Sequence, residues 1–83
     1  MPRKVEWTSQ AKSDLRAIDQ INALHILQVV ALYLATDKGD VKRLRDKEPP
    51  ELRLRVGDYR VRFYSYSDSI LVLSVQHRRA AYR

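Results

Sequence analysis

The chain has 83 residues, of which 45% are hydrophobic, and it contains two glycines and three prolines. This length allows one small domain, residues 1–83, with a thin core, and the composition is typical of a folded chain rather than a disordered one. With no cysteine and only two histidines, the sequence excludes a disulfide framework and argues against a zinc site, so we expect neither a metal nor a cofactor.

The net charge of +6 is unevenly distributed along the chain. Residues 1–40 hold five basic and five acidic groups, whereas residues 41–83 hold eleven basic and five acidic groups. A basic excess in one half of the chain is typical of proteins that bind nucleic acid or an acidic protein partner. The N-terminus has no apolar signal region, and the apolar stretch 21–34 is too short to span a bilayer. We therefore expect a cytoplasmic protein with no membrane partner.

The first half of the chain predicts a strand and two helices. Residues 3–7 alternate between apolar and polar side chains, which favours a short strand. Thr8 or Ser9 then offers an N-cap to a first helix, and Asp19 caps a second helix that runs to about residue 37. Gly39 follows as the expected left-handed residue that ends this helix.

The second helix carries two apolar stripes. One stripe contains Leu24, Leu27, Ala31 and Leu34, and the other contains Ile26, Val30 and Tyr33. Two stripes predict burial over more than half of the circumference of the helix. We expect one stripe to pack on a sheet and the other to pack on the first helix, and we expect a protomer this small to leave part of that surface open to a partner.

The second half of the chain predicts three strands. Residues 40–47 are highly charged and are expected to form a loop or a short turn of helix. Residues 51–63, ELRLRVGDYRVRF, predict two strands joined by a two-residue turn at Gly57-Asp58. After a turn near 67–69, the almost wholly apolar residues 70–75 predict a central strand. The expected fold is α+β, in the order β-α-α-β-β-β, with an antiparallel-rich four-stranded sheet and both helices on one face.

Folding residues 51–63 about their turn places apolar side chains on one face and four arginines on the other. In this pairing Arg55 faces Arg60, and Arg53 faces Arg62. Like charges directly opposite each other are unfavourable, and a good pair forgone is worth roughly 0.2–1 kcal/mol. We therefore expect a polyanion to neutralise this face, because arginine grips phosphate with two parallel hydrogen bonds. The alternative is a solvated basic face that only keeps the hairpin soluble.

The C-terminal tail adds further polar groups to this picture. His77, Arg78 and Tyr82 are expected to join the arginine face, because the last strand ends near the hairpin turn. Several cations with an imidazole and a phenol suit a reaction that passes through a highly negative phosphorane, as when the 2′-hydroxyl of RNA acts as the nucleophile. A basic module that only binds RNA or another anion would have much the same composition.

The run DVKRLRDKEPPELRLRVGDYRVRF, followed by ILVLSVQHRRAAYR, resembles the RelE/ParE superfamily of toxins from toxin–antitoxin pairs. The RelE branch, which the terminal HRRAAYR favours, implies a ribosome-dependent mRNA endonuclease that cleaves in the A site by 2′-hydroxyl attack and inhibits translation. The ParE branch implies instead a non-catalytic inhibitor of DNA gyrase. The resemblance implies as partners an acidic antitoxin, in a heterodimer or a heterotetramer, and, for the RelE branch, the ribosome with its mRNA and 16S rRNA phosphates.

The same resemblance assigns roles to individual residues. Arg53, Arg60 and Arg78 would stabilise the phosphorane, and Tyr82, with His77 as the alternate, would supply the acid. A second set of cations is expected to contact RNA phosphate: Arg55, Arg62, Arg79, Arg83, Lys42, Arg43 and Arg45. Glu51 stands where some relatives have a lysine, and this departs from the catalytic set of the family.

Overall fold

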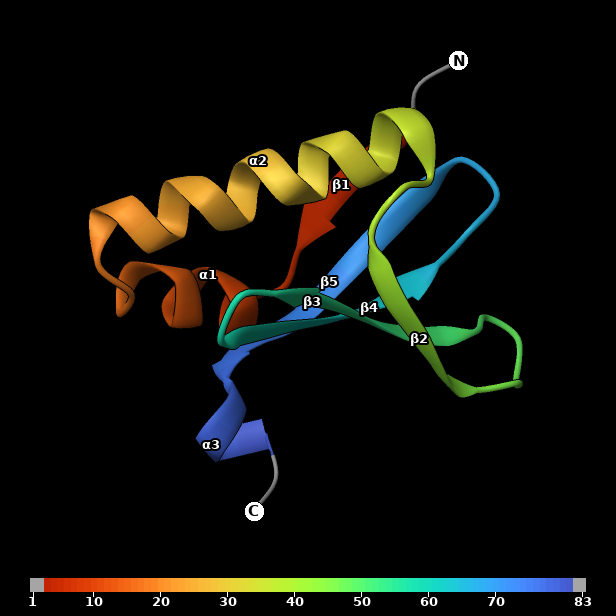
Figure 1. Ribbon diagram of the computed structural model, residues 1–83. Coiled ribbons are helices and arrows are strands. Elements are labelled where there is room, and N and C mark those ends of the chain that lie inside the picture. Colours follow the sequence, from red (N-terminus) through yellow and green to blue (C-terminus); the bar gives the residue numbers. More distant parts are fainter. Residues whose placement is uncertain (1–2, 82–83) are drawn as a thin grey trace.

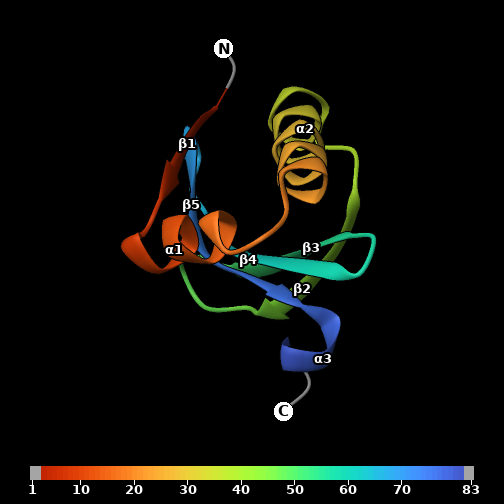
Figure 2. The ribbon, with the colours of Figure 1, turned by 90° about the vertical axis from the view of Figure 1, so that its left-hand side faces the viewer.

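The structure, a computed structural model, describes residues 3–81. Its elements are β1 (Lys4–Trp7), α1 (Ser9–Arg16), α2 (Gln20–Thr36), β2 (Asp40–Arg45), β3 (Glu51–Val56), β4 (Tyr59–Ser65), β5 (Ser69–His77) and α3 (Arg78–Ala81). The strands form one mixed sheet in the order β1-β5-β4-β3-β2, in which β1 and β5 are parallel and the other neighbours are antiparallel (Figure 1). Helices α1 and α2 lie on one side of the sheet and α3 lies on the other (Figure 2).

The α+β class and the central place of the last strand are confirmed, but the sheet has a fifth strand at its edge. The expectation of a loop or a turn of helix at residues 40–47 is wrong, because Asp40–Arg45 form β2, antiparallel to β3. Val41, opposite Leu54, is half-buried and the other side chains of β2 are exposed. An edge strand tolerates so many charges because only one of its sides pairs with a neighbour.

Side-chain caps begin both of the first two helices, as the sequence predicts. The Thr8 hydroxyl accepts a hydrogen bond from the Ala11 amide (3.1 Å), and the Asp19 carboxylate accepts one from the Asn22 amide (3.1 Å). Each cap satisfies one of the backbone N–H groups that a helix start leaves without an internal partner.

The end of α2 differs from the expectation. Asp37, not Gly39, takes the left-handed conformation, with φ at 57°, which aspartate tolerates better than most residues. A Cβ at position 39 would lie 2.9 Å from the Cδ1 atom of Leu54. A larger residue at this position would therefore have to displace the buried Leu54 side chain of β3.

Beyond β1, side chains from the α1 region satisfy the backbone of β5. The pairing of β1 with β5 ends at Trp7 and Val72. The Thr8 hydroxyl donates to the Leu73 carbonyl (3.0 Å), and the Asp14 carboxylate accepts from the Val75 amide (2.9 Å). These contacts fix the second half of β5, which leads directly into α3.

The hydrophobic core lies between α2 and the sheet. One stripe of α2, formed by Ile26, Val30 and Tyr33, is buried. The sheet contributes buried apolar side chains from three strands: Leu54, Val56, Val61, Phe63, Ile70, Val72 and Val75. Phe63 is fully buried, and its ring centroid lies 5.4 Å from that of Tyr33 in a tilted contact, a geometry that aromatic pairs favour.

The other predicted stripe of α2 is not packed on α1. Leu24 is 51% exposed and Leu27 is 39% exposed, while Ala31 is also exposed and Leu34 is half-buried. The expectation is wrong because α1 packs against β5 instead. Within residues 3–81, no element covers the side of α2 that is turned away from the sheet (Figure 2).

Candidate functional site

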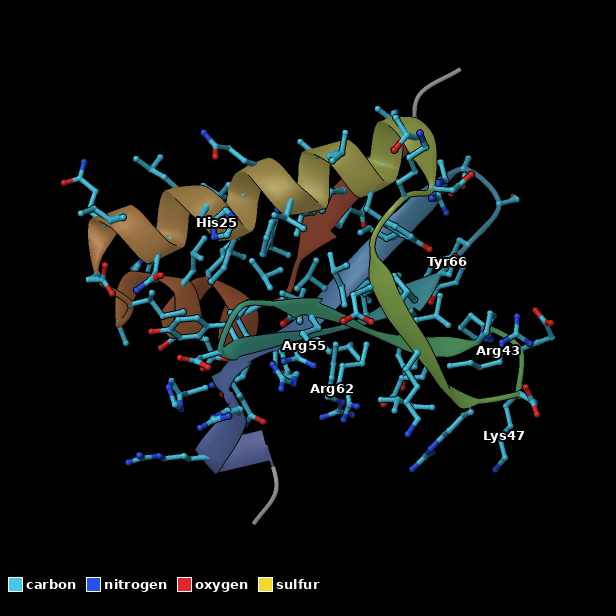
Figure 3. The ribbon with its side chains drawn as sticks, in the orientation of Figure 1. His25, Arg43, Lys47, Arg55, Arg62 and Tyr66 are labelled. Atoms are coloured by element: carbon cyan, nitrogen blue, oxygen red, sulfur yellow. The ribbon has the colours of Figure 1, made fainter. Side chains whose placement is uncertain are left out.

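The β3–β4 hairpin has the register that the sequence predicts. Its turn lies at Gly57, with φ at 56°, and Arg55 pairs with Arg60 while Arg53 pairs with Arg62. Side chains directly opposite each other in an antiparallel pair share one face of the sheet. Figure 3 shows Arg55 and Arg62 on the side of the sheet away from α2. The apolar and arginine faces are thus separated as expected.

The edge strand β2 extends the arginine face by one further cation. Lys42 pairs with Arg53, which in turn pairs with Arg62 on β4. Neighbouring strands lie about 4.8 Å apart, so these three residues, hereafter the cation row, stand side by side across three strands. We use the name basic face for the cation row together with Arg55 and Arg60.

A buried carboxylate partly neutralises the cation row. The Oε2 atom of Glu51 accepts hydrogen bonds from Arg62 Nε (3.1 Å) and Nη2 (2.9 Å). The Glu51 side chain is 6% exposed and that of Arg62 is 41% exposed. Because a buried carboxylate needs a paired charge, Glu51 holds Arg62 in place at the end of the row. Sequence reasoning identified Glu51 only as a departure from the family, although the predicted register already put it diagonally across from Arg62.

Arg60 is placed differently from its predicted role. It is 6% exposed, and its Nη1 atom donates to the carbonyl oxygens of Gly57 (3.0 Å) and Tyr59 (3.1 Å). The guanidinium is therefore committed to the backbone of the hairpin turn. Among residues 3–81 no carboxylate forms an ion pair with it, so its charge still contributes to the potential of the basic face.

His77 does not lie on the basic face, which corrects the expectation from the sequence. It pairs with Tyr59, and the two rings meet edge to face with centroids 5.5 Å apart. Tyr59 packs against the core, on the helix side of the sheet. The imidazole Nδ1 atom accepts a hydrogen bond from the Arg79 amide (3.3 Å), and so His77 helps to begin α3.

Helix α3 is attached to the hairpin turn through Arg78. The Arg78 amide donates to the Asp58 carbonyl (2.6 Å), and its Nε atom lies 3.7 Å from Asp58 Oδ1. Both side chains are more than half exposed, so this ion pair adds little stability. It does place Arg78 and Arg79 beside the turn end of the basic face. Tyr82 and Arg83, also predicted as site residues, lie outside the described residues.

The two remaining predicted phosphate contacts on β2 face different sides of the sheet. Arg45 pairs with Glu51 after an irregularity in the strand, and so shares the side of the basic face. Arg43 is opposite Leu52, whose side chain packs against the core, and it forms an ion pair with Asp46 (3.3 Å). Arg43 therefore lies apart from the basic face.

A buried hydroxyl continues the cation row on β5. Ser74 pairs with Arg62, is 6% exposed, and within the described part of the chain its Oγ atom has no hydrogen-bond partner. Sequence reasoning missed Ser74, because a serine in an apolar strand has no distinctive pattern. Between residues 3 and 81 there is also no group of three or more residues that could hold a metal ion. Cations and a hydroxyl thus lie beside one carboxylate on this face, and the cations suit phosphate groups.

The amino-acid sequence matches the profile of one known protein family. The sequence profile of the family described as "ParE toxin of type II toxin-antitoxin system, parDE" matches residues 5–82. Among curated proteins, none matches the chain in sequence.

Over residues 3–81, no helix is long and apolar enough to cross a membrane.

Several solved toxin structures are similar in fold. The archaeal RelE–RelB complex from Pyrococcus horikoshii OT3 has a TM-score of 0.81 at 22% identity, over 94% of this chain and 97% of that chain. The complex RelBE2 from Mycobacterium tuberculosis has a TM-score of 0.79 at 21% identity, over 94% and 100%. The chromosomal ParDE system from P. aeruginosa has a TM-score of 0.55 at 18% identity, over 90% and 95%. At these identities the likeness establishes a shared fold.

Proposed function

Because the chain belongs to the ParE toxin family of type II toxin–antitoxin systems, we propose that it is a toxin whose basic face acts on RNA, as a ribosome-dependent mRNA endonuclease. The observation that carries this proposal is the cation row, in which Lys42, Arg53 and Arg62 stand side by side across three strands. Neighbouring like charges are unfavourable, Glu51 compensates only part of them, and a phosphate backbone that lies across the row would be attracted to it.

The proposed chemistry uses the 2′-hydroxyl of the RNA as the nucleophile. Its attack on the adjacent phosphorus forms the bond to the 2′-oxygen, which releases its proton to solvent, and breaks the bond to the 5′-oxygen of the next nucleotide, which takes up a proton. The products are a 2′,3′-cyclic phosphate and a 5′-hydroxyl. The intermediate phosphorane carries additional negative charge, and we propose that Arg53 stabilises it together with Arg62, which the sequence predicts only as a phosphate contact. Arg60 contributes its charge from the turn, and Arg78 stands beside the turn end of the face.

The proton donor to the leaving oxygen remains a prediction from the resemblance. We propose Tyr82 for this role, and its position lies outside the described residues. His77 is not proposed again, because its ring lies on the helix side of the sheet against Tyr59. The remaining predicted phosphate contacts, Arg55, Arg45 and Arg79, surround the cation row and suit backbone contacts to ribosomal or messenger RNA.

An acidic antitoxin is the proposed protein partner. The similar solved structures from P. horikoshii and M. tuberculosis are complexes of RelE with RelB and of RelBE2. An acidic segment that covers the basic face would compete with RNA for the same guanidinium groups, and the binding would weaken with salt at its rim.

A second candidate function follows from the family itself. The matching profile is that of ParE toxins, and the ParE branch, as the resemblance implies, inhibits DNA gyrase without cleaving RNA. The RelE structures nevertheless have the higher TM-scores, 0.81 and 0.79 against 0.55. This ranking concerns the fold, and only an activity measurement separates the two functions.

The decisive experiment adds the full chain in parallel to a purified translation reaction and to a gyrase supercoiling reaction. The proposal expects protein synthesis to stop within the first rounds of translation while supercoiling proceeds unchanged. Loss of supercoiling with normal translation would overturn it in favour of the gyrase inhibitor. If neither reaction is affected, the chain is an anion-binding module without either activity.

A further inference from the structure

Helix α2 is free of charge on all sides. None of its seventeen residues, Gln20–Thr36, is Asp, Glu, Lys or Arg, although the whole chain carries a net charge of +6. Only one side of the helix packs on the sheet. On the other side Ile21 is 81% exposed, Leu24 is 51% exposed and Leu32 is 54% exposed. Large apolar side chains are normally buried, so the exposed side of α2 presents apolar surface that residues 3–81 do not cover.

Five of the exposed residues of α2 form a stripe with a symmetric spacing. Successive residues of an α-helix are rotated by about 100°, which places five exposed residues within an arc of about 80°. We call this the outer stripe: Ile21, Leu24, Gln28, Leu32 and Ala35. Their separations along the chain are three, four, four and three residues, and Gln28 lies at the centre. The pattern therefore reads alike from either end of the helix.

We propose that the outer stripe is a self-association surface whose occupant is a second copy of this chain. An antiparallel pair of α2 helices related by a two-fold axis at Gln28 would place Leu24 of each copy against Leu32 of the other. Ile21 would meet the small side chain of Ala35, and the two Gln28 amides would meet at the axis. Each amide both donates and accepts, so a symmetric pair satisfies both.

Charge favours a second copy over an acidic partner at this surface. Two chains of net charge +6 repel each other, and the contact least opposed by this repulsion is a face that carries no cation. An acidic antitoxin finds its complement on the basic face, on the opposite side of the sheet (Figures 2 and 3). A two-fold contact is also isologous, which requires a self-complementary pattern such as the outer stripe.

The size of the surface sets the expected strength. A helix of seventeen residues is about 25 Å long, and one helix pair buries less than the roughly 800 Å² per partner of a standard interface. The dimer is therefore expected to dissociate in the micromolar range and to be concentration-dependent. It would leave the basic face of each copy open, so this inference does not depend on the proposed function.

Sedimentation equilibrium of the full chain, from about 1 to about 500 µM, tests the proposal. The wild type is expected to pass from monomer to dimer across this range. Leu24→Lys with Leu32→Lys places cations opposite cations and is expected to weaken association at least 10-fold. Leu24→Glu with Leu32→Lys places opposite charges in register and is expected to associate more tightly than the double lysine variant. Ser13→Lys with Ser67→Lys adds the same charge at exposed positions away from α2 and is expected to match the wild type. Circular dichroism verifies that each variant is folded.

Three results would overturn the proposal. The first is a wild type that stays monomeric at every concentration. The second is a double lysine variant that associates like the wild type. The third is a glutamate–lysine variant that associates no better than the double lysine variant. If the monomeric wild type instead gains hydrogen-exchange protection along α2 when its antitoxin is added, the outer stripe receives a helix of that partner and not a second copy.

Discussion

The basic face and the outer stripe of α2 lie on opposite sides of one small core, and they differ most in charge. The basic face gathers cations in a cross-strand row and retains one buried carboxylate, Glu51, to hold Arg62. The outer stripe has no ionisable side chain. The comparison shows that the net charge is concentrated where it can meet a polyanion and absent where an apolar partner can pack.

The largest expected effect comes from removing a side chain of the hydrophobic core, which lies between the basic face and α2. Phe63→Ala would delete a fully buried ring that packs on Tyr33 of α2. We expect the free energy of unfolding to fall by about 3–5 kcal/mol, through lost burial and a cavity. Urea denaturation measures this change. Tyr66→Ala, at an exposed position, is the control and should stay within about 0.5 kcal/mol of the wild type. If Phe63→Ala lowers the free energy of unfolding by less than about 1 kcal/mol, the neighbouring side chains repack to fill the cavity.

Arg53→Ala removes the centre of the cation row. If Arg53 stabilises the phosphorane, mRNA cleavage should fall about 10²–10³-fold, the usual loss for one such group. Single-turnover cleavage on programmed ribosomes measures the effect. Arg16→Ala removes the same charge from an exposed site on α1 and should leave the rate unchanged. Equal rates for both variants would remove Arg53 from the reaction.

Glu51→Gln tests whether the ion pair with Arg62 stabilises the basic face. It replaces a charge-assisted hydrogen bond to Arg62, and the free energy of unfolding should fall by about 1.5–3 kcal/mol, nearer the lower value because Arg62 is 41% exposed. Releasing Arg62 should also add one phosphate contact and steepen the salt dependence of single-stranded RNA binding by about 0.7 in log–log slope. Glu6→Gln, on the exposed side of β1, should change neither quantity. An unchanged salt slope would mean that Arg62 already contacts phosphate while paired.

The smallest expected effect concerns the start of α2. The Asn22 side-chain amide, together with its backbone amide, holds the pKa of Asp19 below its ordinary value of 3.8. A lowered pKa stabilises the fold above the ordinary value, and this contribution is lost as the pH falls through the pKa of the folded state. Asp19→Ala should therefore lower the melting temperature slightly at neutral pH, and the deficit should shrink below pH 3.8. A deficit that is constant with pH would show that the charge of Asp19 has no part in it.

The hairpin was predictable because its alternation and its Gly57-Asp58 turn fix one register. The edge strand β2 was not, because its exposed, charged residues leave no apolar period to detect. His77 was assigned to the wrong face because the prediction rested on its closeness to the hairpin turn and did not consider which way its side chain points. The pairing of β4 with β5 is also irregular: Arg62 pairs with Ser74 but Phe63 pairs with Val72. One extra residue in a strand shifts which side chains face the core.

The site was predictable in composition and less so in detail. The four arginines of the hairpin do share one face, as their spacing requires. The commitment of Arg60 to the turn carbonyls depends on side-chain geometry that no spacing reveals. An open part of the apolar surface of α2 was expected from the small size of the chain, but apolar residues do not say whether the cover comes from the same chain.

Primer extension on a reporter mRNA, in a purified translation system with and without ribosomes, tests the central claim most directly. The account predicts new 3′ ends within A-site codons when wild-type chain and ribosomes are both present, and none when ribosomes are left out. Intact mRNA under both conditions would contradict it. Translation blocked without cleavage would show that the basic face binds the ribosome but does not carry out the reaction.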